Sequence, residues 1–199
     1  MERLLIDDNM KITTKQITMT AALLAICIVS QMFKNTSVYI TGPIINTCII
    51  IAVLNAGLIS GVILSVITPV TSFFITGSPI VSAIPLIMPC IMIGNVLLAV
   101  TLSAVIRLFL RKENNAAKLI KKSETVAIVI GMISGSVVKA IFMGGVISNT
   151  LIPMFIPEKM MSKMAVFQAT FSVTQLITAL IGSVFAFVIN TALKKIEKF

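Results

Sequence analysis

The chain of 199 residues has no histidine, no tryptophan and a single tyrosine, and only seven of its residues are aspartate or glutamate. These carboxylates lie in the N-terminal tail, in polar segments or at the ends of apolar runs, never within a run. General acid–base catalysis and metal activation of water depend on histidine or on paired carboxylates. We therefore predict that the chain is not an enzyme, has no catalytic residues, and binds neither a metal nor a cofactor.

Motifs that couple transport to energy are missing as well. The sequence has no G-x-x-x-x-G-K-[ST] loop for nucleotide phosphates. No Asp, Glu or His stands inside an apolar run, where it could relay protons or cations. Cys27, Cys48 and Cys90 lie in apolar runs without Cys-x-x-Cys spacing, which is typical of packing residues rather than of a zinc or redox site. A lone transporter with its own energy source is therefore disfavoured.

Apolar side chains are what the sequence has in excess. Hydrophobic residues make up 57% of the chain and charged residues 12%, against about 45–50% and about 25% in soluble domains. At about 20 residues per crossing, the chain has room for about six spans. We predict an all-α integral membrane bundle of six transmembrane helices, a single transmembrane domain over residues 1–199, in which Asn55-Ala56-Gly57 separates the second and third helices. The expected helices cover residues 16–33, 44–55, 58–76, 80–110, 124–147 and 162–193.

The net charge of +9 is concentrated between Arg107 and Lys122 and at the C-terminus. Basic residues in short segments beside apolar spans mark the cytoplasmic face, so we do not expect binding to nucleic acid. With six spans, both termini and the loop 111–122 share that face. The loops 34–43, 76–80 and 148–161 then face outward. The sequence thus predicts a multi-pass protein of the cell membrane, surrounded by lipid, with both termini cytoplasmic.

Lys139 is an isolated charge in the middle of the fifth predicted helix. A charge at the centre of a bilayer costs about 2.5–3.5 kcal/mol or more. Asn95 and Gln175 fall at comparable depth in the fourth and sixth helices, and Gln168 shares a face with Gln175 at helical spacing. One interpretation is a polar pocket open to the outside, in which Lys139 binds an anionic group of a substrate. The other is hydrogen bonding between helices, with Lys139 bonded to backbone carbonyls. Both stay open.

Small residues recur at spacings of four in three of the predicted helices. Such spacing lets another helix approach closely. It indicates either packing within the chain or a docking surface for a partner. The residues are Ala21 and Ala25 in the first helix, Gly57, Gly61 and Ser65 in the third, and Gly131 and Gly135 in the fifth.

With its size, six predicted spans, cytoplasmic N-terminus and Ala21-x-x-x-Ala25, the chain resembles the S components of energy-coupling factor (ECF) transporters. Four segments resemble segments of S components in sequence, and the resemblance covers nearly the whole chain. They are Gly42-Pro43-Ile44-Ile45-Asn46, the segment from Gly57 to Pro69, Thr76-Gly77-Ser78-Pro79 and Ile93-Gly94-Asn95.

This resemblance implies the substrate-binding membrane subunit of an ECF-type ABC importer, which captures a vitamin or similar small micronutrient from outside. Such a subunit docks through its first helix, here with Ala21 and Ala25, onto a transmembrane coupling protein that carries two cytoplasmic ABC ATPases. Two other hypotheses stay open, namely a self-contained small transporter or channel, and a structural or assembly membrane protein. In the family the ligand lies between helices four to six, under the loop that joins helices one and two, and the matching positions are Lys139, Asn95, Gln168, Gln175 and, in that loop, Tyr39.

Overall fold

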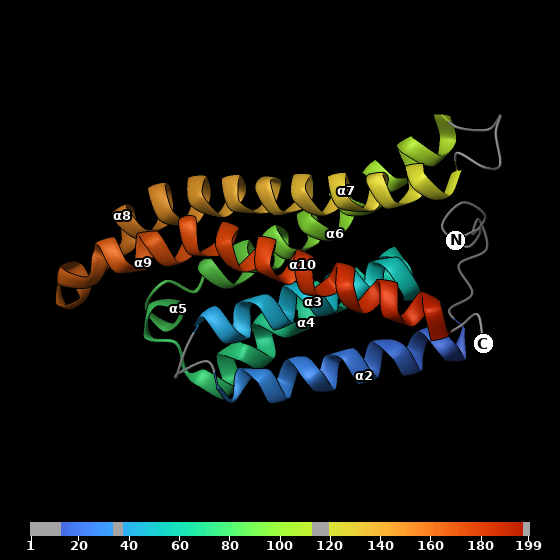
Figure 1. Cartoon of the computed structure of the whole chain (residues 1–199). Coiled ribbons are helices and arrows are strands. Elements are labelled where there is room, and N and C mark those ends of the chain that lie inside the picture. The colour runs from blue at the N-terminus through green and yellow to red at the C-terminus, as the bar shows by residue number, and fades with distance from the viewer. Residues whose placement is uncertain (1–12, 34–37, 113–119, 197–199) are drawn as a thin grey trace.

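A computed structural model describes residues 13–33, 38–112 and 120–196 of the chain, and for residues 111–112 and 120–123 it describes the backbone alone. Within these residues all regular structure is helical, and Figure 1 shows the long helices running side by side along one axis. We call the end where α2 begins and α10 ends the terminal end, and the opposite end, with α5, α8 and α9, the far end. The elements are α2 (Thr14–Gln31), α3 (Val38–Ala56), α4 (Leu58–Thr76), α5 (Pro79–Ala83), α6 (Ile87–Lys112), α7 (Ile120–Met143), the π-helix η1 (Gly144–Leu151), α8 (Ile152–Phe155), the 3-10 helix η2 (Glu158–Lys163), α9 (Met164–Phe171) and α10 (Val173–Ile196).

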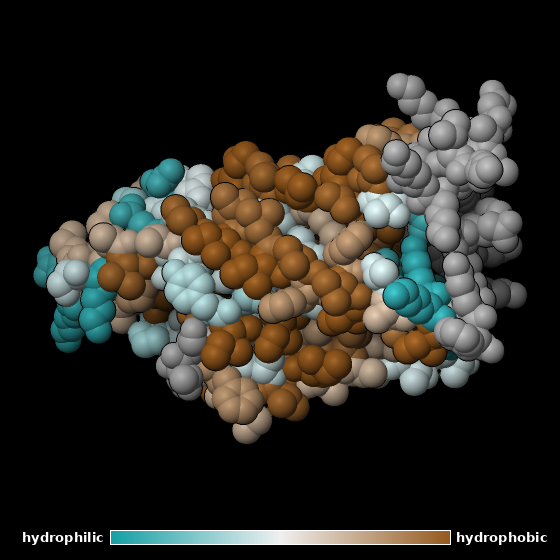
Figure 2. Space-filling model, viewed as in Figure 1, coloured by the Kyte–Doolittle hydropathy of each residue, from teal (hydrophilic) through white to brown (hydrophobic). Residues whose placement is uncertain are grey.

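Five helical stretches in the described part of the chain are long and apolar enough to cross a membrane. On the face drawn in Figure 2, apolar side chains cover the middle and hydrophilic patches lie towards the ends. The chain therefore has the helices of a multi-pass membrane protein. The predicted first span, α2, is not among the five, because Lys15, Gln16 and Gln31 lower the hydropathy of its ends. The five stretches are Val38–Ala56, Leu58–Thr76, Ile87–Leu110, Glu124–Phe155 and Glu158–Ile196.

Helix boundaries differ from the prediction mainly at the far end. α3 begins at Val38 instead of residue 44, so that Tyr39 lies in a helical turn and not in a loop. The predicted helix 80–110 is divided into α5 and α6. Pro85 disfavours helical geometry in the residue before it, and Ile84 accordingly has φ −127° and ψ 83°.

The last two predicted helices also differ from the prediction at the far end. α7 continues beyond residue 147 through η1 into α8. The predicted helix 162–193 is broken at Ser172, whose φ of −116° and ψ of −92° separate α9 from α10. By contrast, Gly57 forms the turn between α3 and α4 where the sequence places it. Its φ of 96° suits a residue without a side chain.

The glycines of the third and fifth predicted helices serve packing within the chain. A Cβ atom on Gly135 would lie 3.0 Å from the backbone oxygen of Leu98, and one on Gly131 would lie 2.9 Å from Cδ1 of Leu102. A Cβ on Gly61 would lie 2.3 Å from a side chain of α3. These three glycines therefore let α7 approach α6, and α4 approach α3, as small-residue spacings do in membrane bundles.

Two clusters of buried apolar side chains stabilise the bundle. The larger joins α2, α3, α4, α6, α7 and α10, with fully buried Ile50, Leu64 and Leu102 among its members. The smaller lies at the far end and includes Ile84 and Ile147. The site described next is lined in part by side chains of the second cluster.

Candidate functional site

A cavity of about 320 Å³ lies at the far end, where α3, α4, α5, α6, α7, α9 and α10 meet. Its volume is near the lower limit of small-molecule sites, which span about 300–1,000 Å³. Val166, with 64% of its surface exposed, lies at the rim. Most of the wall is apolar and three of its side chains are phenylalanines. The larger apolar residues of the wall are Ile45, Phe73, Ile80, Met88, Ile91, Phe167 and Phe171.

Lys139, on α7, lines this cavity and is only 3% exposed. Its Nζ donates a hydrogen bond to Oδ1 of Asn46 on α3, over 2.6 Å. An ammonium group has donors only, so the oxygen of the amide must face it. Because the amide is neutral, this bond holds Lys139 in place without neutralising its charge. Among the described residues that line the cavity, Lys139 is the only charged one.

Asn95, on α6, also lines the cavity and is 4% exposed. No described residue forms a hydrogen bond with its side-chain amide. The amide therefore faces the open space of the cavity, where its donors and its acceptor remain available. A ligand with a neutral hydrogen-bonding group would supply the missing partner.

Gln175 reaches the same cavity from α10. Its Nε2 donates to the backbone oxygen of Thr170 over 3.2 Å. This carbonyl lies just before the break at Ser172, so the glutamine satisfies a group that a continuous helix would have paired. Its side-chain oxygen accepts no hydrogen bond from a described residue.

The other two predicted site residues lie outside the cavity wall. Gln168 donates from Nε2 to the backbone oxygen of Ser148 over 3.0 Å, and the Ser148 hydroxyl donates to the backbone oxygen of Gln168 over 3.0 Å. This pair of bonds joins α9 to η1. Tyr39 is 56% exposed in the first turn of α3, where its neighbour Val38 lines the cavity instead. The structure thus brings together Lys139, Asn95 and Gln175, but not Gln168 or Tyr39.

Asn46 is the residue that sequence reasoning missed. It stands near the start of a long apolar run, as a neutral side chain without the rarity of a buried charge. Only its hydrogen bond to Lys139 in the folded chain singles it out. The three phenylalanines of the wall were not predicted either, because phenylalanine is common in the apolar runs of this sequence.

Comparison with known proteins adds no relative. No protein-family model matches the chain, and neither a curated protein nor a solved structure does. The resemblance to ECF S components therefore stays a prediction.

The second candidate region is the outer face of α2. Ala21 and Ala25 are both exposed there, while Leu23 and Cys27 on the opposite face are buried. Ala22 and Thr18 extend the same exposed stripe of small side chains. The two alanines are therefore not used for packing inside the chain, unlike the glycines of α4 and α7.

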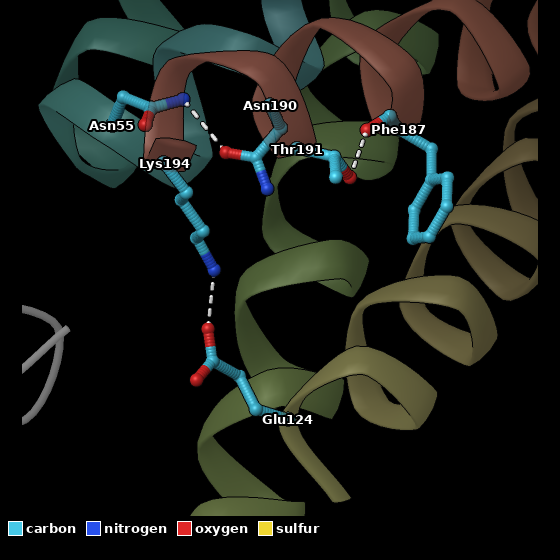
Figure 3. A network of polar contacts seen from close by, with 6 residues as sticks. All are labelled: Asn55, Glu124, Phe187, Asn190, Thr191 and Lys194. Atoms are coloured by element: carbon cyan, nitrogen blue, oxygen red, sulfur yellow. Dashed lines mark hydrogen bonds and ion pairs between the residues drawn. The ribbon is translucent and has the colours of Figure 1, made fainter. Parts of the chain in front are cut away.

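Polar contacts tie the helices together at the terminal end (Figure 3). Nδ2 of Asn55 on α3 donates to Oδ1 of Asn190 on α10 over 3.2 Å. One turn further along α10, Lys194 forms an ion pair with Glu124 of α7. Glu124 thus has a structural partner far from the cavity. Both contacts hold α3 and α7 against α10 at the end opposite the candidate site.

Proposed function

We propose that the chain is the substrate-binding membrane subunit of an ECF-type importer and captures a small anionic micronutrient, a vitamin or similar compound, from outside the cell. One observation carries this proposal. A buried lysine without a counter-ion among the described residues, and an amide without a hydrogen-bond partner among them, line one mostly apolar cavity of ligand size.

An anionic ligand accounts for the charge of Lys139. A buried ion is costly when it has no opposite charge, and an ion pair in such a site is favourable only with further hydrogen bonds. The described wall of the cavity provides no carboxylate, so the opposite charge comes from outside the chain. Asn95 and Gln175 supply hydrogen bonds for the neutral parts of the ligand.

Dependence on partner proteins accounts for the absence of energy-coupling motifs in the sequence. The sequence has neither a nucleotide-binding loop nor a carboxylate inside an apolar run, so the energy for uptake is supplied by a transmembrane coupling protein and two ABC ATPases. The exposed alanines of α2 provide a face against which another helix can lie closely.

In this proposal α2 also crosses the membrane, which brings the number of spans to six. Both termini and the loop 111–122 are then cytoplasmic. Residues 113–119 of that loop, and the terminal residues 1–12 and 197–199, lie outside the described residues. The basic residues of the loop and of the C-terminus favour this orientation. The cavity then opens to the outside, because the far end is opposite the terminal end.

Labelling of single cysteines tests the topology. In a background without Cys27, Cys48 and Cys90, Lys118→Cys should react with a membrane-impermeant maleimide only after cells are permeabilised. Lys159→Cys, at an exposed position in η2, should react in intact cells and serves as the control. Rapid labelling at position 118 in intact cells would overturn the proposed orientation.

Reconstitution tests the function itself. The purified chain in liposomes should bind substrate but not accumulate it. Addition of the coupling protein and ATPases from the same genome should give uptake that depends on ATP hydrolysis. Uptake by the chain alone would instead support a self-contained transporter. Absence of any co-purified small molecule by mass spectrometry, together with no uptake in the complete system, would support a structural role.

A further inference from the structure

Asn46 lies where α10 packs closely against α3. Thr47 Oγ1 donates to the backbone oxygen of Gly182 on α10 over 2.9 Å. A Cβ atom on Gly182 would lie 2.8 Å from Cβ of Asn46 and 2.8 Å from the backbone oxygen of Pro43. α10 therefore presses directly on α3 at this point, and Asn46, itself only 2% exposed, has little freedom except at its amide.

The amide of Asn46 can be compared with a carboxylate at the same position, because asparagine and aspartate have nearly the same shape. An aspartate at this position would place a carboxylate beside Nζ of Lys139, and the resulting ion pair would neutralise the lysine within the chain. Asparagine provides the same hydrogen bond and no charge. Its Nδ2 donates no hydrogen bond to a described residue, so it can donate to the same anion that Lys139 binds.

From this arrangement we infer that Asn46 is a specificity-determining residue, which holds Lys139 in position while leaving its positive charge for a ligand anion. The inference rests on the proposed function and deepens it by naming the substrate class. One cation with no described carboxylate beside it selects a ligand with a single negative charge. The apolar wall with its three phenylalanines selects a compact apolar body, as in an aryl- or alkyl-carboxylate. A second charge, or a positive one, would be buried without a partner.

Three probes of one shape and different charge test the substrate class. Full-length protein in detergent is titrated calorimetrically with 4-phenylbutyrate, its neutral amide 4-phenylbutanamide and the cation 4-phenylbutylamine. We expect wild type to bind the carboxylate about 10-fold or more tightly than the amide, and not to bind the amine. Binding of the amine, or equal binding of carboxylate and amide, would overturn the inference, and so would the absence of carboxylate binding.

Variants of the pair test the role of Asn46. Asn46→Asp should weaken carboxylate binding by about 30-fold or more, because an internal anion occupies Lys139, and should leave the melting temperature unchanged or higher. Asn46→Leu removes the hydrogen bond without adding charge and should keep the preference for the carboxylate. Asn190→Asp makes the same change at a buried amide of the terminal end and should stay within about twofold of wild type.

Other outcomes decide against the inference. If Asn46→Leu loses as much affinity as Asn46→Asp, then Asn46 serves only to hold the helices, and the specificity role is wrong. If Asn46→Asp does not fold, Lys139→Gln replaces it. Glutamine can still donate to Asn46 but has no charge, so carboxylate binding should fall by about 30-fold while amide binding stays constant. Unchanged carboxylate binding in either variant contradicts the inference.

The role of Asn46 and the proposed function of the chain can be refuted separately. Binding by the purified chain is measured without partners, so loss of the charge preference refutes the role of Asn46 even when ATP-dependent uptake is observed. Conversely, a chain that shows the charge preference and yet transports without ATPases refutes the proposed function and leaves the role of Asn46 intact.

Discussion

Lys139→Met should strongly weaken binding of the anionic substrate while the protein stays folded. Methionine preserves the length of the side chain and removes the buried charge, so we expect binding to weaken by about 3–5 kcal/mol. Thermal stability should be unchanged or increased, because no uncompensated charge is then buried in the empty cavity. Calorimetric titration of the co-purified ligand and a thermal melt in detergent measure the two effects.

Lys163→Met is the matched control for this variant. Lys163 is exposed in η2, at the same end of the bundle but outside the cavity wall. Its replacement should change neither affinity nor stability appreciably. If Lys139→Met binds the native ligand as tightly as wild type, or if that ligand proves to be a cation, the anionic site is wrong.

Replacement of both Ala21 and Ala25 by tryptophan should reduce transport without affecting substrate binding. The two positions lie one turn apart on the exposed face of α2, so large side chains there would hold a partner helix away. Overpacking of a close helix contact costs about 1–3 kcal/mol, and assembly with the coupling protein should weaken by about 10-fold or more. Co-purification of the ATPases and ATP-dependent uptake are the measurements, with ligand titration as the test of folding.

Ala104→Trp distinguishes docking from a general effect of bulk in the membrane. Ala104 is exposed on α6, which lies across the bundle from α2 (Figure 1). This variant should assemble and transport as wild type does. Normal assembly of the double α2 variant would instead leave Ala21 and Ala25 as ordinary lipid-facing residues.

Much of the helix arrangement could be predicted because apolar runs and glycine turns are local signals. Gly57 separates α3 from α4 by its own backbone conformation, and no distant residue is needed. The far end could not be predicted in the same way. The break at Ser172 is accompanied by contacts between residues far apart in the sequence, such as the paired hydrogen bonds between Gln168 and Ser148. A hydropathy pattern does not predict such contacts.

The site was predicted to the extent that polar side chains are rare inside apolar runs. Lys139, Asn95 and Gln175 were found by their depth, and they do line one cavity. Gln168 was assigned to the same face as Gln175 on the assumption of an unbroken helix, which the break at Ser172 invalidates. Asn46 has meaning only beside Lys139, 93 residues further along the chain, and a single sequence does not show that proximity.

The apolar cluster shared by α2, α3, α4, α6, α7 and α10 also bears on the permeability of the surrounding membrane. Fully buried Ile50, Leu98 and Leu102 occupy the interior between the cavity and the terminal end, where the contacts of Asn55 and Glu124 hold the helices closed. A dry hydrocarbon layer of this kind is a steep barrier to hydrated ions and to chains of water. A bilayer that contains this protein alone should therefore keep a proton gradient and a membrane potential.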